Sequence, residues 1–432
     1  MSTTALKKTL LPIHIWAIAV GLVISGDYFG WNYGWAAAGT VGFLWATIIV
    51  TILYICFIFS FTELTTAIPD AGGPFAYASK TLGVFGGLIA GYATLVEFLL
   101  AAPAIGFALG SYVHFLIPSV GVLPVAIFCY FLFTGINLLG IKESAIFTLL
   151  ITILAIAELL LFMGIIAPSF KIDNFLQNPM PFGIKGIFAA LPFAIWFYLA
   201  IEGVAMVAEE VKDPQRNISK GYIWGIFTLV ILAFGVMILT GGITNWQVLS
   251  KIDYPLPEAV SIVLGKENSF TKLFASIGLL GLVASFHGII IGYSRQIFAL
   301  ARAGFLPKQL ALIHPKRKTP HWALLIGGVV GIICLCTATT DKLIILSVLG
   351  AIILYIISMI SLFKLRKQKG YKPVYTTPFY PLFPIIALVL SVVCLIAIVY
   401  YNLYLSILFL IGFIAVCIVY YGVKYANKKI EK

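Results

Sequence analysis

The stretch VISGDYFGWNYGW runs from Val23 to Trp35 and interrupts the first long apolar segment of this 432-residue chain. Glycine weakens a helix interior by roughly 1 kcal/mol, and a carboxylate inside an apolar segment is costly unless it faces a cavity or a partner. Both occur here, as Gly26 and Asp27. Five apolar segments later the combination returns in Ala200-Ile201-Glu202-Gly203. We therefore expect two discontinuous helices. Glycines that only allow close helix packing are the alternative, but packing does not account for the acids.

The composition places these segments in a lipid bilayer. Hydrophobic residues make up 61% of the chain and charged residues 10%, with a mean hydropathy of +1.07, which is too little charge for a soluble domain of this length. Apolar runs long enough to cross the hydrocarbon core recur throughout, so we predict an all-α integral membrane protein of about twelve transmembrane helices. The alternating pattern of a β-barrel is absent. The spans are expected near 14–39, 43–66, 83–116, 122–139, 144–167, 184–210, 221–244, 269–303, 322–338, 343–364, 381–400 and 404–424.

The basic residues indicate orientation rather than a nucleic-acid partner. With a cytoplasmic N-terminus, only six of the 28 Lys and Arg residues fall on the outer side, which is the positive-inside bias. Both termini are then cytoplasmic, in a multi-pass protein of the cell membrane. The stretch from His314 to Pro320 is expected to be a solvated loop or, alternatively, an anchor for lipid headgroups. All six cysteines lie in apolar segments, so disulfides are not expected.

Four motifs in order resemble the amino acid–polyamine–organocation permease family. They are Ser25-Gly26, ELTTAIPDAGGPFAYASKTLG (Glu63–Gly83), EGVAMVAEEVKDPQRNISKG (Glu202–Gly221) and SRQIFALARAGFLPKQL (Ser294–Leu310). Within that family, VISGDYFGWNYGW and ATLVEFLLAAPAIG (Ala93–Gly106) look most like ethanolamine permeases. The resemblance covers about residues 14–400.

The resemblance implies a LeuT-like 5+5 inverted repeat followed by two extra C-terminal helices, with the first and sixth spans discontinuous. The expected parts are a cytoplasmic N-terminus (1–13), a first repeat of five spans (14–167), a second repeat of five spans (184–364), the last two spans (381–424) and a cytoplasmic C-terminus (425–432).

Asp27 is the central candidate for substrate binding. In amino acid permeases of the family that the chain resembles, bare backbone N–H groups at the first break bind a substrate carboxylate. Here an acid directly follows Ser25-Gly26, which disfavours a carboxylate and favours an ammonium. At about 4 Å and an effective dielectric near 20, an ammonium–carboxylate pair is worth roughly 4 kcal/mol before desolvation. The alternative role of Asp27 is to cap the second half of the helix.

The resemblance and the positions at membrane depth add further candidates. For substrate binding they are Ser25, Gly26, Glu97, Trp196, Tyr198, Leu199, Ala200, Glu202 and His287, and for ion coupling they are Glu158 and Ser285. Where the family carries a GFE-like pattern, this chain has Ala200-Ile201-Glu202, so the backbone at that break is left open. Glu158 occupies the place where some proton-coupled relatives carry a lysine, and a buried carboxyl there could carry the proton instead.

Each of these candidates has a simpler interpretation. Glu97 and Glu158 could be neutral acids that hydrogen-bond between helices, Trp196 could be a packing residue, and His287 a structural donor. For Trp196, a cation–π contact with an ammonium is the functional alternative.

The predicted function is import of ethanolamine or a similar small amino alcohol by alternating access. The driving force is an ion gradient, with H⁺ favoured over Na⁺, or the solute's own gradient. A general amino acid or polyamine permease is the alternative, and a membrane sensor or structural protein that does not transport is a third. No nucleotide-binding motif or metal-ligand cluster points to an enzyme or a pump, and no cofactor is expected. The sequence carries no signal for oligomeric state.

Overall fold

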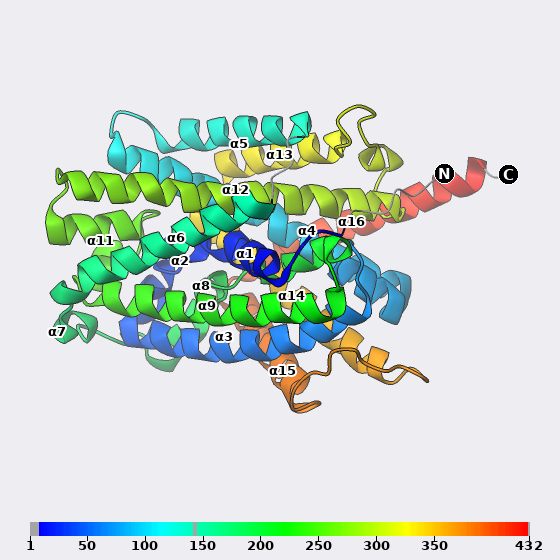
Figure 1. The fold of residues 1–432 in the computed structure, drawn as a ribbon, viewed down its shortest axis with the longest axis horizontal. Helices are drawn as coiled ribbons and strands as arrows, with labels where there is room; N and C mark the ends of the chain where they lie inside the picture. The colour runs from blue at the N-terminus through cyan, green and yellow to red at the C-terminus, as the bar shows by residue number, and fades with distance from the viewer. Residues whose placement is uncertain (1–7, 141–144, 431–432) are drawn as a thin grey trace.

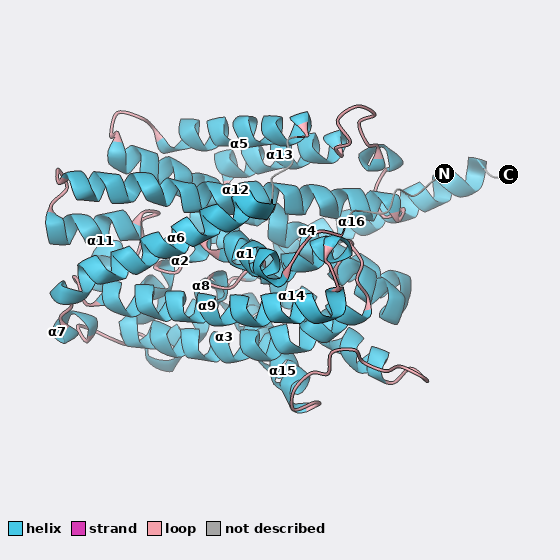
Figure 2. Ribbon diagram, viewed as in Figure 1, coloured by secondary structure: helices cyan, strands magenta, loops and turns pink. Residues whose placement is uncertain are grey.

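The computed structural model describes residues 8–140 and 145–430, and these are helical apart from loops, turns and an isolated bridge between Leu10 and Val211 (Figure 2). Within them, ten helical segments are long and apolar enough to cross a membrane. These are α3 (Tyr33–Ala67), α4 (Pro74–Leu116), α5 (Val122–Leu139), α6 with the following 3₁₀ turn (Ala145–Ser169), α8 with η2 (Gly183–Glu210), α9 (Pro214–Gly241), α12 (Ser269–Arg302), α14 (Thr340–Arg366), α15 (Leu382–Tyr401) and α16, of which Leu403–Gly422 is the apolar part. Two shorter apolar segments, Pro12–Tyr28 and His321–Thr337 (α13), match the first and ninth expected spans. The all-α membrane fold is therefore confirmed.

The first span is interrupted, but later than the sequence indicated. Helix α1 (Pro12–Val23) runs through a slight irregularity at Ile24 into α2 (Ser25–Tyr28). The chain then becomes extended at Phe29 and turns at Gly30, whose φ of 90° is a left-handed conformation that favours glycine. The break thus follows Asp27 instead of beginning at Ser25-Gly26, because the glycine able to reverse the backbone is Gly30.

The sixth span is interrupted where it was expected. Helix α8 ends at Trp196, and a ten-residue 3₁₀ helix, η2 (Ile201–Glu210), follows a non-helical turn. Ala200 ends that turn with a φ of 74°, a conformation that costs a residue with a side chain roughly 1–2 kcal/mol. Ala200 therefore adopts a left-handed backbone conformation at the position where the GFE-like pattern of the family has glycine.

Glycine and proline residues also determine where several helices kink or begin. Helix α3 kinks at Gly39 and α4 at Gly83, both with positive φ, so the first and second spans join inside one helix. The turn before Pro74 interrupts the segment Pro69–Lys80, and α9 begins at Pro214. The long loop after α9 carries α10 (Trp246–Leu249) and α11 (Pro255–Leu264).

The interrupted helices lie inside the bundle. Figure 1 shows α1 and α8 near its centre, with α5 and α13 along one edge and α15 at the opposite edge. Helix α1 packs against α9, α8 against α3, and α4 against α14. Apolar side chains such as Phe128 and Leu150 remain exposed on outer helices, at 62% and 61%, which suits a lipid environment.

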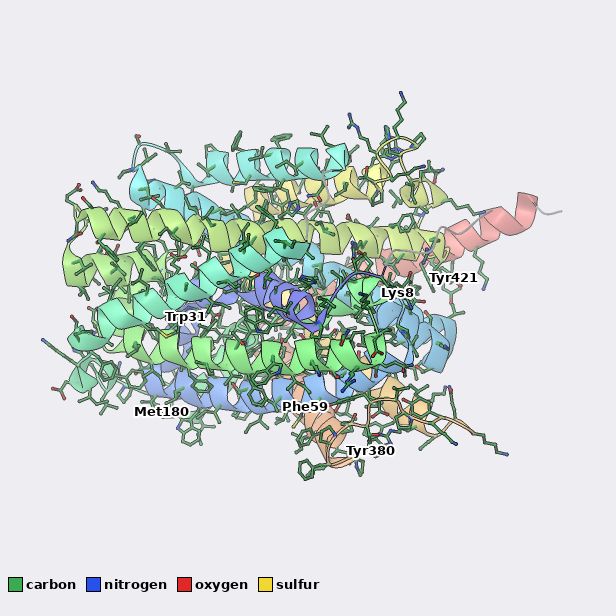
Figure 3. The ribbon with its side chains drawn as sticks, viewed as in Figure 1. Lys8, Trp31, Phe59, Met180, Tyr380 and Tyr421 are labelled. Carbon is green, nitrogen blue, oxygen red and sulfur yellow. The ribbon has the colours of Figure 1, made fainter. Side chains whose placement is uncertain are left out.

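Lys8 and Tyr421 lie at the same end of the molecule (Figure 3). Residues 1–7 and 431–432, parts of the predicted cytoplasmic termini, fall outside the described residues.

Candidate functional site

A narrow cavity lies between the two interrupted spans. Its volume is about 10 Å³, which is about the least that can hold one water molecule. The lining is mostly apolar and comes from both breaks, α4 and α12: Leu22, Val23, Ser25, Ala101, Ile105, Trp196, Leu199, Ala200 and Ile289. Four candidates from the sequence, Ser25, Trp196, Leu199 and Ala200, are among them. The structure thus shows the site in a closed, contracted form.

Trp196 joins the two breaks. Its indole N–H donates to the backbone oxygen of Phe29 at 3.0 Å, and the two rings pack edge to face. A Cβ at Gly30 would lie 2.5 Å from Trp196 Nε1, and a Cβ at Gly26 would lie 2.5 Å from the Trp196 backbone oxygen. Side chains at these two positions would force the spans apart, so both glycines are needed for this close approach.

Asp27 is fully buried, and neither carboxyl oxygen has a hydrogen-bond donor among the described residues. The residue lies in the last turn of α2, with its N–H donating to Ile24 O, so it does not cap the second half of the span. The Tyr198 hydroxyl at the sixth-span break is hydrogen-bonded to Thr51 Oγ1 at 2.7 Å. Asp27 lies two residues after Ser25, which lines the cavity, but is not itself in the lining. A carboxylate at the C-terminal end of a helix also meets the negative end of the helix dipole.

Ser285 and His287 lie on different faces of α12. The hydroxyls of Ser285 and Ser25 are 2.8 Å apart, and the Ser285 hydroxyl donates to Leu22 O at 2.7 Å. His287 faces α5, with Nδ1 3.3 Å from Asn137 Nδ2 and its ring against Phe133. The structure therefore brings Ser285 to the first break and places His287 away from the cavity lining.

Glu158 contacts the first span just before its break. The Tyr28 hydroxyl donates to Glu158 Oε2 at 2.7 Å and also lies 3.2 Å from Ala155 O. Glu158 Oε1 has no donor among the described residues and faces Gly278 of α12. The Tyr112 hydroxyl donates to Tyr28 O at 3.1 Å, so α4 and α6 both hold this end of α2.

Glu97 and Glu202 are both fully buried. The Tyr355 hydroxyl of α14 donates to Glu202 Oε2 at 3.1 Å, and the Ser347 hydroxyl donates to the backbone oxygen of Glu97 at 2.6 Å. None of the described Lys, Arg or His residues is ion-paired with Glu97, Glu202, Asp27 or Glu158. Within residues 8–140 and 145–430, the centre of the protein therefore carries acidic groups that form no ion pair with a basic residue.

Sequence reasoning missed most of the apolar lining. Ala101 and Ile105 lie one and two turns beyond Glu97, and Ile289 lies one turn beyond Ser285, so helical spacing from the candidate residues would have found them. Helical spacing could not have identified Tyr355, because its hydrogen bond to Glu202 depends on how α14 packs against the sixth span.

A family model described as "Amino acid permease" matches residues 12–423. The chain belongs to the amino acid permease family. The permease is 29% identical to an uncharacterized transporter of Rhizobium meliloti (strain 1021), over 81% of this chain and 77% of the relative. It is 26% identical to two proteins of Bacillus subtilis (strain 168). One is described as a branched-chain amino acid permease, and the match covers 74% of this chain and 72% of the relative. The other is described as a methylthioribose transporter, and the match covers 76% of this chain and 74% of the relative. The expected family is thus confirmed, and the protein is a membrane transporter and not an enzyme.

Proposed function

We propose that this permease carries a small amine-bearing solute, ethanolamine or a similar amino alcohol, across the cell membrane by alternating access. The observation that carries the proposal is Asp27: a fully buried carboxyl, without a donor or a basic partner among the described residues, beside the cavity and next to the break of the first span. A buried carboxylate is strongly favoured when a cation pairs with it.

Ethanolamine has an ammonium and a hydroxyl but no carboxylate. Ser25 is the hydroxyl group in the lining, and Trp196 presents an aromatic ring to the same space, which suits an ammonium. Contact between Asp27 and a bound ammonium requires a change at the first break, because Asp27 is outside the lining of the contracted cavity. The carboxylate of glycine or alanine would face Asp27 as a like charge, so these solutes should bind less well.

A general amino acid permease is the second candidate. The apolar lining from Val23, Ile105 and Ile289 would pack against an aliphatic side chain, and one relative is described as a branched-chain amino acid permease.

We further propose that H⁺ drives transport, with Glu158 as the proton carrier and Na⁺ less favoured. We place both termini in the cytoplasm and assign residues 14–167 and 184–364 to two inverted repeats. The shared end of Lys8 and Tyr421 supports the placement of the termini.

The test is ligand-stabilised melting of the purified protein against ethanolamine, choline, putrescine, glycine, alanine and arginine. Ethanolamine should stabilise it most. Tight alanine binding without a response to ethanolamine would favour the amino acid alternative. Flux of the stabilising solute into proteoliposomes would exclude a protein that does not transport.

Asp27→Asn should weaken ethanolamine binding at least about thirtyfold, the equivalent of roughly 2 kcal/mol, because the ammonium loses its counter-charge. Asp173→Asn makes the same chemical change at an exposed position of α7 (Ile172–Phe175) and should leave affinity unchanged. Unchanged affinity in folded Asp27→Asn protein would disprove the ligand role.

A further inference from the structure

The loop between α12 and α13 carries three consecutive cations, Lys316, Arg317 and Lys318, and all three are exposed. Hydrogen bonds within the loop close this cationic turn. The His314 backbone N–H donates to Thr319 O at 2.8 Å, and the Lys318 N–H donates to His314 O at 2.9 Å. The Arg317 N–H donates to Nδ1 of His314 at 3.2 Å. The turn therefore presents three positive charges from one compact segment.

The cationic turn is held at the ends of two outer spans. Arg317 Nη1 lies 3.5 Å from Leu138 O, and the Thr319 hydroxyl donates to the same oxygen at 3.4 Å. Leu138 belongs to the last turn of α5, a span of which only 17% is buried inside the protein. Helix α13 then begins at His321, and α5 and α13 form one edge of the bundle (Figure 1). Figure 3 shows side chains with nitrogen ends pointing outward from this loop, at the end of the molecule where Lys8 lies.

Exposed apolar side chains flank the three cations. Leu312 and Ile313 precede them and are 51% and 50% exposed, and Trp322 follows in the first turn of α13 and is 45% exposed. Tryptophan is enriched where the hydrocarbon of a membrane meets the headgroups. Long basic side chains beside apolar ones keep their charges at the same level. The cationic turn therefore lies at the depth of lipid headgroups.

The protein supplies no negative charge to balance the turn. The sequence has no Asp or Glu between Glu267 and Asp341, and no acid in the described part of the chain is ion-paired with the three cations. Clusters of basic residues beside the end of a span attract anionic lipids. We propose that the cationic turn and Trp322 bind the headgroup of an anionic phospholipid in the leaflet on the side of the termini.

The chemistry of the turn favours an anionic headgroup over a zwitterionic one. A phosphate diester offers two anionic oxygens, which accept from the guanidinium of Arg317 and from the lysine ammonium groups. Phosphatidylglycerol carries this phosphate alone, whereas phosphatidylcholine adds a quaternary ammonium that the same cations repel. The acyl chains of the lipid then lie against the exposed apolar side chains of α5 and α13. The site goes beyond the proposed function, because it does not depend on which solute is carried.

The test is the affinity of the first lipid bound to the full chain in detergent, measured by native mass spectrometry with phosphatidylglycerol or phosphatidylcholine. Phosphatidylglycerol should bind the wild type more tightly. Replacing Lys316, Arg317 and Lys318 together by Gln should weaken that binding about a hundredfold, since each charge near a membrane surface contributes about fivefold. The double variant Lys316→Gln/Lys318→Gln keeps Arg317 beside Leu138 and should still lose about twentyfivefold, so the test stands if the triple variant does not fold.

The matched control removes three exposed cations from the loop after α14, as Lys367→Gln/Lys369→Gln/Lys372→Gln. It should keep the wild-type affinity, because these residues are not consecutive and Trp322 is not beside them. The proposal is overturned if the wild type binds both lipids equally, if the variants of the cationic turn keep their affinity, or if the control loses as much, which would indicate general surface charge.

Inorganic phosphate distinguishes a lipid from a free anion. At the concentration of the lipid it should not displace phosphatidylglycerol, because it has no apolar part to lie against the spans. Displacement at that concentration would overturn the lipid as the ligand. No solute is present in these measurements, so they can fail while the role of Asp27 stands, and the reverse.

Discussion

The hydroxyl of Tyr28 lies 2.7 Å from Glu158 Oε2 and joins the last residue of α2 to the fifth span. Any movement of the first span at its break therefore changes the surroundings of this carboxyl. A group whose environment differs between two conformations has a different proton affinity in each, and such a difference is what couples proton binding to a conformational equilibrium.

Glu158→Gln should abolish pH-driven accumulation of substrate while leaving binding and counterflow exchange largely intact. The measurement is uptake into proteoliposomes under an imposed proton gradient. Tyr28→Phe removes the hydrogen bond but keeps the carboxyl, so it should weaken coupling without abolishing it. If Glu158→Gln protein still concentrates substrate, Glu158 only satisfies its neighbours.

Gly26→Ala should stop transport without preventing insertion into the membrane. The new methyl group would lie 2.5 Å from the Trp196 backbone oxygen, and such overpacking costs about 1–3 kcal/mol in the closed form. The measurement is flux normalised to the amount of folded protein. Gly164→Ala in α6 is the control, because a Cβ at Gly164 would extend into open space. Equal flux in both variants would show that the close approach is not needed.

Glu63→Gln should destabilise the protein by about 1–3 kcal/mol, because it removes the charged acceptor of several hydrogen bonds in a partly buried ion pair. Arg366 donates to the two Glu63 oxygens at 2.5 and 2.7 Å, and the Thr377 backbone N–H donates at 2.9 Å. Thermal unfolding measures the effect. Glu267→Gln breaks a pair with Lys272 whose side chains are 86% and 49% exposed, and should change stability little. Similar losses in the two variants would contradict this prediction.

Asp253 should make the folded protein more stable at acidic pH than at neutral pH. It lies in the loop between α10 and α11, outside the spans, and accepts hydrogen bonds from Tyr33 and Thr340 at 2.7 and 2.8 Å. Burial raises the pKa of Asp253 to about 6. The folded protein therefore binds this proton more tightly than the unfolded chain, so its contribution is fully present below the ordinary Asp pKa and is lost as the pH rises through about 6.

Asp253→Asn should flatten the change in melting temperature between about pH 4 and pH 6. Asp173→Asn, at an exposed position, should keep the wild-type profile. An unchanged slope in Asp253→Asn would assign the acid-dependent stability to other groups.

The interruptions of the spans could be predicted from sequence because their causes are local. Gly39, Gly83, Pro74 and Pro214 each lie where the structure kinks or begins a helix. Backbone preferences of Gly and Pro act within a few residues, so they are visible without knowledge of the packing. The sixth-span break at Ala200 was visible for a different reason, the acid that follows it.

Contacts between helices could not be predicted, although the placement of Asp27 follows from local spacing. Asp27 lies two residues after Ser25 in α2, and two residues turn about 200° around a helix. Asp27 is therefore outside the cavity lining that includes Ser25. The contacts Glu202–Tyr355 and Glu63–Arg366 join residues far apart in sequence, 153 and 303 positions, and depend on the packing of whole helices.

The cavity of about 10 Å³ is too small for any amine-bearing solute, since it holds about one water molecule. If the solute binds between the breaks, as proposed, it can bind only the molecules in which the half-helices have moved apart. Its measured affinity is then its intrinsic affinity multiplied by the fraction of such molecules. A substitution that loosens the closed packing far from the cavity would consequently appear as tighter binding, although it touches no solute. The measured affinity would then depend on how easily the half-helices move apart as well as on the contacts between the solute and the protein.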